Sequence, residues 1–293
     1  MVADAAYATC LRLARAHYEN FPVASRLLPK ASRPYVAAIY AFARLADDFA
    51  DEGDRSDDAR LALLDDWQRR LDQAVAATPA DDGSDASRVF IAVSDTIRTH
   101  RLEPELLGDL LSAFRQDVTV KRYEDWDALY DYCRRSANPV GRLVLRISGY
   151  RDADLDRASD AICTALQLTN FWQDLERDFR NGRLYVPQAL VRSCGADEND
   201  LGRRRMTPAW QAALTESARR TRELFDAGRP LAGKVRGRLR WELRATWLGG
   251  VRILDRLEAG RFDVFHERPT LGWRDAAVIG IRTMTWPREK QHA

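Results

Sequence analysis

The chain has 293 residues, 46 of them basic and 44 acidic, and 45% of its residues are hydrophobic. This balance argues against a nucleic-acid-binding protein, which would need a basic domain or stripe, while the apolar fraction is that of an ordinary globular protein. The four cysteines share no CxxC spacing, and no apolar run is long enough for a membrane span or a secretory signal, so we expect reduced thiols and a cytoplasmic location.

Hydrophobic periodicity predicts helices along nearly the whole chain and no strand of useful length. The expected helices span residues 3–17, 34–51, 56–77, 87–101, 104–118, 125–148, 153–181, 208–227, 231–259 and 272–282. Polar segments at 78–85 and 182–208 separate some of them. We find no internal repeat and no linker rich in Gly or Ser, so we expect one all-α domain over residues 1–293 with a core of about 10–265.

The helix expected at 34–51 carries a polar stripe at positions i, i+4, i+7 and i+11, formed by Tyr40, Arg44, Asp47 and Asp51. Asp48 lies beside this stripe. The acids gather where the helix should end, and the negative end of the helix dipole disfavours carboxylates there. A bound cation would offset that repulsion.

The helix expected at 153–181 repeats the design. Its polar stripe consists of Gln167, Asn170, Phe171, Asp174 and Asp178. A separate apolar stripe, which we expect to pack into the fold, consists of Leu168, Trp172, Leu175 and Phe179. Carboxylates four residues apart lie about 6 Å apart along one face and repel each other unless a cation lies between them.

Two interpretations of the stripes stay open at the level of the residues. Mg²⁺ binds one or two carboxylates and completes its shell with water and substrate phosphate, so a magnesium site that holds a diphosphate is one of them. A solvated charged face is the other, since surface helices usually carry charges. Donors suited to phosphate oxygens follow the second stripe, namely Arg180, Arg183 and Tyr185.

Three longer motifs identify a family. They read Ala38-Ile-Tyr-Ala-Phe-Ala-Arg44 with Asp47-Asp48-x-x-Asp51, Gln167-x-x-Asn170-x-x-x-Asp174-x-x-x-Asp178, and Gly182-Arg-Leu-Tyr-Val-Pro187. In order and spacing the chain resembles the squalene and phytoene synthase family, the all-α head-to-head prenyl synthases, from about His17 to about Gly260. The resemblance implies an isoprenoid-synthase-type helical bundle around a central cavity.

The resemblance also implies roles for individual residues. The expected magnesium ligands are Asp47, Asp48, Asp51, Asn170, Asp174 and Asp178. Arg44 joins Asp47, Asp51, Asp174 and Asp178 as catalytic, because it would neutralise the leaving diphosphate. The residues expected to contact the prenyl diphosphate substrate are His17, Tyr18, Asn20, Phe21, Tyr40, Arg44, Tyr132, Gln167, Gln173, Arg183 and Tyr185.

At several positions the chain departs from the family pattern, and these departures favour one of the family's activities over the others. The family usually carries Arg at Gln173 and Tyr at Gly250, and its Ala-Gly-x-Val-Gly turn has Asn138-Pro139 here. The pattern is most similar to that of the bacterial family members of hopanoid biosynthesis, which ionise presqualene diphosphate and capture water to give hydroxysqualene. We expect Mg²⁺ dependence, no need for NADPH, a carbon–oxygen lyase, and water admitted or oriented by Gly250, Gln173 or Asn138.

Alternatives remain at this stage. The chain could instead be a prenyltransferase that condenses two farnesyl or geranylgeranyl diphosphates, or a non-catalytic assembly protein with the same fold. We expect no nucleic-acid partner, and a presqualene diphosphate synthase as a working partner. Because the substrate is poorly soluble, peripheral contact with the inner membrane is also expected, through Lys234, Arg236, Arg238 and Arg240, unless these side chains simply form a solvated helix face.

Overall fold

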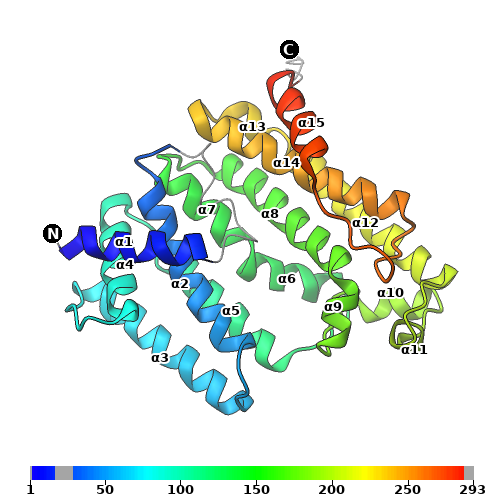
Figure 1. The fold of residues 1–293 in the computed structure, drawn as a ribbon, viewed down its shortest axis with the longest axis horizontal. Coiled ribbons are helices and arrows are strands. Elements are labelled where there is room, and N and C mark those ends of the chain that lie inside the picture. The colour runs from blue at the N-terminus through cyan, green and yellow to red at the C-terminus, as the bar shows by residue number, and fades with distance from the viewer. Residues whose placement is uncertain (1, 17–28, 287–293) are drawn as a thin grey trace. The chain divides into compact units, whose positions relative to one another are not determined.

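The computed structural model describes residues 2–16 and 29–286. They form two compact units, and Figure 1 traces the chain through both. The first unit contains residues 1–119 and 139–152, and the second contains residues 120–138 and 153–293. The expectation of a single domain stays a prediction.

Six helices belong to the first unit among the described residues. They are α1 (Val2–Ala16), α2 (Arg33–Asp51), α3 (Asp57–Ala76), α4 (Asp85–His100), α5 (Glu105–Thr119) and α7 (Asn138–Ile147), the last beginning one residue before the unit does. Helix α2 lies at the centre and packs against α1, α3, α4 and α5. The rings of Phe42, Trp67 and Phe90 meet in its core, where Trp67 and Phe90 have centroids 4.5 Å apart. This packing fixes the buried face of α2 and leaves its polar stripe on another face.

The remaining described helices belong to the second unit. They are α6 (Trp126–Ser136), α8 (Ala153–Gln173), α9 (Leu175–Arg180), α10 (Gln188–Ser193), α11 (Glu198–Gly202), α12 (Pro208–Gly228), α13 (Leu231–Lys234), α14 (Gly237–Ala259) and α15 (Trp273–Met284). Helix α8 packs against α6, α12 and α14, and α15 packs against α14. Trp172 is fully buried, and its indole N–H donates to Thr221 Oγ1 over 2.9 Å. That contact fixes the rotation of α8 about its axis.

The predicted all-helical fold is confirmed, since the described residues contain no strand and only one isolated bridge, Arg122 to Leu184. Several boundaries differ from the prediction. The helix expected at 125–148 is interrupted at Ala137, because Pro139 lacks the N–H that a continuous helix would use. The helix expected at 231–259 is interrupted at 235–236, and the loop expected at 182–208 contains α10 and α11.

Two further expectations concern membrane-spanning helices and the state of the cysteines. None of the helices described here has the length and apolar character needed to cross a membrane. All four cysteines are free thiols, of which Cys10 and Cys133 are buried while the other two are partly exposed. Burial raises the pKa of Cys10 to about 12, so this thiol stays protonated and unreactive at neutral pH.

Candidate active site

The first acidic stripe lies on α2 as predicted. Tyr40, Arg44, Asp47 and Asp48 are partly exposed, and Asp51, the last residue of the helix, is exposed. Burial raises the pKa of the Tyr40 hydroxyl, while the charge of Arg44 lowers it and the two acids raise it. The stripe therefore forms one connected polar surface from Tyr40 to the end of the helix.

Arg44 is the hub of that surface. Its guanidinium lies 2.6 Å from Asp48, 2.6 Å from Glu52 and 3.3 Å from Asp47. Its side chain is only a quarter exposed, so the pairs are less screened than ordinary surface pairs. Asp48 and Glu52 thus hold Arg44 in place, and Asp47 is its more distant partner.

Arg60 supplies a positive charge at the C-terminal end of α2, where the helix dipole led us to expect a bound cation. This residue of α3 donates from Nη1 to the carbonyl of Ala50 over 2.8 Å and from Nη2 to the carbonyl of Gly53 over 2.7 Å. Its Nη1 also reaches the carbonyl of Glu52 over 3.2 Å. The C-terminal end of α2 therefore already has a cationic cap, and the clustering of acids there does not by itself require a bound metal ion.

The second stripe begins on α8 and continues on α9, because the helix expected at 153–181 bends at Asp174. The backbone of Asp174 has φ −99° and ψ 11°, outside the helical range. The hydrogen-bond ladder nevertheless continues through the bend, from Asp174 N to Asn170 O and from Asp178 N to Asp174 O, each over 2.8 Å. The prediction of one uninterrupted helix was wrong, but the register that relates Asn170, Asp174 and Asp178 survives.

The apolar stripe of this helix packs as predicted over its first three residues, while the fourth, Phe179, is partly exposed. Leu168 and Trp172 are fully buried, and Leu175 is nearly so. On the polar stripe, Asn170 is exposed, and Asp174 and Asp178 are partly exposed. The oxygen donors of the second stripe are thus open to solvent while its neighbours form the core.

An arginine that the sequence analysis missed contacts this stripe. Arg268 lies in the connection between α14 and α15, and its Nε donates to Asp174 Oδ1 over 2.5 Å. It is 94 residues away along the chain, so no local pattern could have related the two. The same connection is held by Gln173, whose amide nitrogen donates to the Pro269 carbonyl over 2.5 Å, and by Arg204, which donates to the Phe265 carbonyl over 2.6 Å.

Four aromatic side chains of the second unit gather beside the stripe. Phe171 and Tyr185 stack in parallel with ring centroids 3.7 Å apart. Tyr132 lies 6.2 Å from Phe171, and Tyr123 stacks on Tyr185 at 5.7 Å. All four are buried. The structure thus brings together Tyr132, Phe171 and Tyr185, which the sequence analysis singled out separately, and adds Tyr123.

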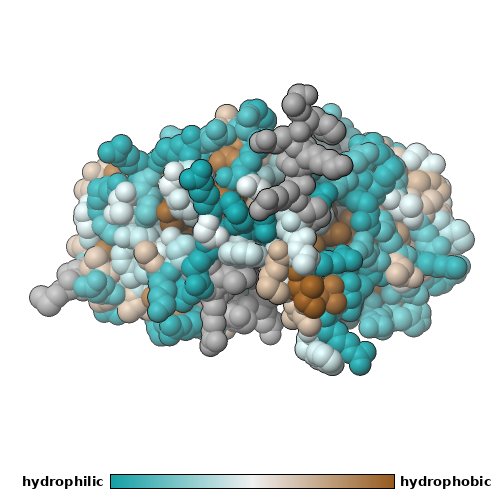
Figure 2. All heavy atoms as spheres, turned by 90° about the horizontal axis from the view of Figure 1, so that it is seen from above, coloured by the Kyte–Doolittle hydropathy of each residue, from teal (hydrophilic) through white to brown (hydrophobic). Residues whose placement is uncertain are grey.

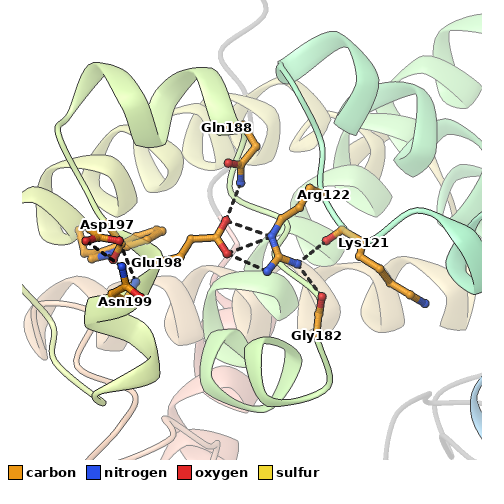
Figure 3. A network of polar contacts seen from close by, with 8 residues as sticks. Lys121, Arg122, Gly182, Gln188, Asp197, Glu198 and Asn199 are labelled. Carbon is orange, nitrogen blue, oxygen red and sulfur yellow. Dashed lines mark hydrogen bonds and ion pairs between the residues drawn. The ribbon is translucent and has the colours of Figure 1, made fainter.

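The loop that carries Arg183 and Tyr185 is held by Arg122, as Figure 3 shows. Arg122 donates to both carboxylate oxygens of Glu198, over 2.8 Å from Nη2 and 3.0 Å from Nε, and to the carbonyl of Gly182 over 2.6 Å. Gly182 has φ +77°, a conformation that favours glycine, and it turns the chain back after α9. The bidentate pair therefore fixes the turn that positions Arg183 and Tyr185.

Three residues proposed to handle water have other contacts. A Cβ on Gly250 would lie 2.6 Å from both Leu166 Cδ2 and Phe225 Cζ, so this glycine permits close helix packing and opens no space for water. Asn138 accepts a hydrogen bond from Thr164 over 2.9 Å, and both residues are buried. Gln173 is bound to Pro269. These contacts favour structural roles for all three, contrary to the sequence-based interpretation.

Some predicted residues lie outside the described part of the chain. They are His17, Tyr18, Asn20 and Phe21. Gln167 is described, and it lies partly exposed on α8. Among residues 2–16 and 29–286, no three His, Cys, Asp or Glu side chains form a ready-made metal cage.

The fold and the two acidic stripes define the class of the protein, which is that of the helical isoprenoid synthases. Residues 14–275 match the squalene/phytoene synthase family, and the chain belongs to it. It is therefore a member of a family of enzymes that process prenyl diphosphates.

Individual relatives agree with this assignment. The chain is 41% identical to the hydroxysqualene synthase of Zymomonas mobilis over 71% of its own length and 67% of the relative's. It is 34% identical to the hydroxysqualene synthase of Sinorhizobium fredii, over 91% and 88% of the two chains. The crystal structure of squalene synthase HpnC from Alicyclobacillus acidocaldarius is similar with a TM-score of 0.80 and 39% identity, covering 89% of this chain and 95% of that one.

Proposed function

We propose that this protein is a hydroxysqualene synthase, which converts presqualene diphosphate and water into hydroxysqualene and diphosphate. The observation that carries the proposal is identity of 34–41% to hydroxysqualene synthases over most of the chain. The reaction breaks the carbon–oxygen bond to diphosphate, and water later adds to the rearranged carbocation and loses a proton. No electrons are transferred overall, so the proposal includes no reductant and no NADPH.

The two acidic stripes supply a donor set that suits magnesium. The acids and Asn170 of the stripes offer carboxylate and amide oxygens, which are hard donors of the kind that Mg²⁺ prefers. The residues proposed to hold magnesium are Asp47 and Asp51 in the first unit, with Asp48 as a further candidate, and Asn170, Asp174 and Asp178 in the second unit. When bound, Mg²⁺ would supply Lewis-acid neutralisation of the leaving diphosphate. The ion pair of Asp48 with Arg44 at 2.6 Å favours a positioning role for Asp48.

Arg44 is proposed to bind the diphosphate. Its partners Asp48 and Glu52 limit the rotamers of its long side chain, so less conformational entropy is lost when the guanidinium meets phosphate oxygens. Arg183 and Tyr185 are proposed as further donors, and Arg122 keeps their loop in place. Each of these groups would favour loss of the diphosphate by stabilising its negative charge.

The aromatic cluster is proposed to protect the carbocation. The faces of Tyr132, Phe171 and Tyr185 carry negative electrostatic potential, and each can stabilise a nearby cation by about 0.5–2 kcal/mol. The parallel stack of Phe171 on Tyr185 keeps those two rings from turning. Because the rings are buried, they would also exclude water until rearrangement is complete.

Product analysis tests this proposal. The protein is incubated with presqualene diphosphate or with farnesyl diphosphate, each with and without Mg²⁺ and NADPH. Hydroxysqualene formed from presqualene diphosphate with Mg²⁺ alone is the expected result. A C30 product from farnesyl diphosphate would instead show the condensing activity of a prenyltransferase. If no such product forms, a separate presqualene diphosphate synthase must supply the substrate.

A single substitution tests the role of the second stripe. Asp174→Asn keeps the shape of the side chain but removes its charge, so turnover should fall by at least about 100-fold, as expected when about 3 kcal/mol of transition-state stabilisation is lost. Asp160→Asn makes the same change elsewhere on α8 and serves as the matched control. Near-normal turnover of the Asp174 variant would remove the proposed mechanism.

A further inference from the structure

Helix α15 exposes apolar side chains along one face. Trp273 is 77% exposed, Ile281 58% and Met284 68%. These positions, together with the exposed Ala277, follow the spacing i, i+4, i+8 and i+11, so they form a single stripe. Scattered apolar residues are normal on a protein surface, but a continuous stripe on one helix is a mark of an interaction site.

The opposite face of α15 attaches the helix through charge. Asp275 is buried, and its carboxylate accepts hydrogen bonds from Arg252 and Arg256 of α14, the latter over 2.7 Å. Thr283, also buried, offers its carbonyl to Arg244 Nη1 over 3.2 Å. The usual polarity of a surface helix is thus reversed in α15, because its buried face carries an ion-pair network and its exposed face carries an apolar stripe.

Basic residues are concentrated near the C-terminal end of this helix, where Arg229 and Arg244 lie over the ring of Trp286. The segment 229–241, which contains α13 and enters α14, has five basic residues and no acidic one, in a chain whose charges otherwise nearly balance. Helix α13 packs on α14, and α14 packs on α15. Within α15 itself, Arg274 and Arg282 are exposed. Figure 2 looks onto the side where α13 and α15 lie in Figure 1, and apolar side chains reach the surface there among hydrophilic ones.

Tryptophan and arginine meet next to the stripe. The guanidinium of Arg244 lies 5.4 Å from the ring of Trp241 and 5.5 Å from that of Trp286. Trp241 is 38% exposed. Rings with one polar edge and long basic side chains are the groups that favour the boundary between lipid headgroups and acyl chains.

We propose that α15 docks on the surface of an anionic lipid bilayer. Its apolar stripe lies in the headgroup–acyl boundary, and the arginines and Lys234 around it bind the acidic headgroups. Charge favours this partner over a second copy of the chain, since two such basic surfaces would repel each other. The biological reason for this docking rests on the proposed function, because a membrane would hold the prenyl substrate. Lipid binding itself is measured without substrate.

Sedimentation with vesicles tests the proposal. We expect the protein to bind vesicles of phosphatidylcholine and phosphatidylglycerol in equal amounts, and to bind phosphatidylcholine alone much more weakly. Added salt should release it, because salt screens the headgroup charge. The triple variant Trp273→Ser, Ile281→Ser, Met284→Ser should bind at least about tenfold more weakly, since it loses most of the apolar surface that enters the lipid.

Controls separate the surface from general effects of substitution. Val75→Ser removes another exposed apolar side chain, in α3, and should leave vesicle binding unchanged. Replacing Arg236 and Arg238 by Glu should weaken binding to the acidic vesicles. Circular dichroism verifies that each variant is folded, and turnover of detergent-dispersed presqualene diphosphate, if the proposed function holds, should be unchanged in the triple variant.

Three outcomes would overturn the proposal. The first is equal binding of the wild-type protein to both kinds of vesicle, or to neither. The second is a folded triple variant that binds acidic vesicles like the wild type. The third is a wild-type dimer that the triple variant converts to monomers, which would make the stripe an interface between two copies. Absent turnover with intact vesicle binding would contradict the proposed function alone.

Discussion

Gly250 offers a direct test of the packing in the second unit. A Cβ at this position of α14 would lie 2.6 Å from Leu166 Cδ2 and 2.6 Å from Phe225 Cζ. Phe225 is fully buried, so its ring has little room to move. Overpacking of this kind costs about 1–3 kcal/mol, whereas alanine gains about 1 kcal/mol over glycine in helix propensity. Gly250→Ala should therefore be destabilising by up to about 2 kcal/mol.

The neighbouring Gly249 is the matched control. Its Cβ would meet only Leu271 Cδ1 at 3.4 Å, an ordinary contact, so Gly249→Ala should be neutral or stabilising. The propensity term is common to both variants and cancels in their difference. The difference is then the overpacking cost of about 1–3 kcal/mol, so at about 2–4 °C per kcal/mol the Gly250 variant should unfold roughly 2–12 °C below the Gly249 variant.

Thermal unfolding followed by circular dichroism measures this difference, and product analysis accompanies it. A Gly250 variant as stable as the Gly249 variant would refute the packing argument. So would a stable Gly250 variant that releases less hydroxysqualene and more of other products, because that pattern belongs to a glycine that admits water.

Two further predictions concern polar networks of the second unit. Arg122→Met should lower the free energy of unfolding by about 1–3 kcal/mol, because Glu198 loses its bidentate partner. The variant should also raise KM, because it loosens the turn at Gly182. Arg192→Met breaks a more exposed pair and serves as the control, and an unchanged KM in the Arg122 variant would contradict the role of the turn. Backbone and arginine hydrogen bonds hold the pKa of the Asp275 carboxyl below its ordinary value of 3.8, so the stability it contributes is present above that pH and is lost as pH falls through the lowered value. The difference in unfolding temperature between the wild type and Asp275→Asn should then be large at pH 7 and shrink below about pH 4, and a difference that does not depend on pH would contradict this account.

Local periodicity was enough to predict the longer helices and the positions of both stripes on them, but not the short helices α10 and α11. Leu168 and Trp172 pack as their spacing predicted, because the hydrophobic period of a helix directly determines which face is buried. The interruptions at Asp174 and at 235–236 were missed, because tertiary contacts and isolated backbone angles decide them. Pro139 did carry a local signal for the break after α6, since proline removes a backbone donor.

Contacts between distant segments could not be predicted in the same way. Arg268 meets Asp174 across 94 residues, and Arg122 meets Glu198 across 76. In both cases a charged residue lies in a segment with no periodic pattern, so nothing local distinguishes it from the many arginines on the surface. The dipole argument at the end of α2 failed for the same reason, because Arg60 supplies the cation from the next helix.

Helix α15 shows where a rule of patterning is reversed. Hydrophobic periodicity alone would turn Trp273 and Met284 toward the core, yet they are exposed, while Asp275 is buried. The reversal is stable because Arg252 and Arg256 satisfy the buried carboxylate, so its desolvation is offset by strong hydrogen bonds. The exposed apolar stripe itself adds no stability to the fold, because apolar side chains stabilise a protein only when they are buried. The charge network thus keeps an apolar surface exposed, as the proposed docking of α15 on a lipid surface requires.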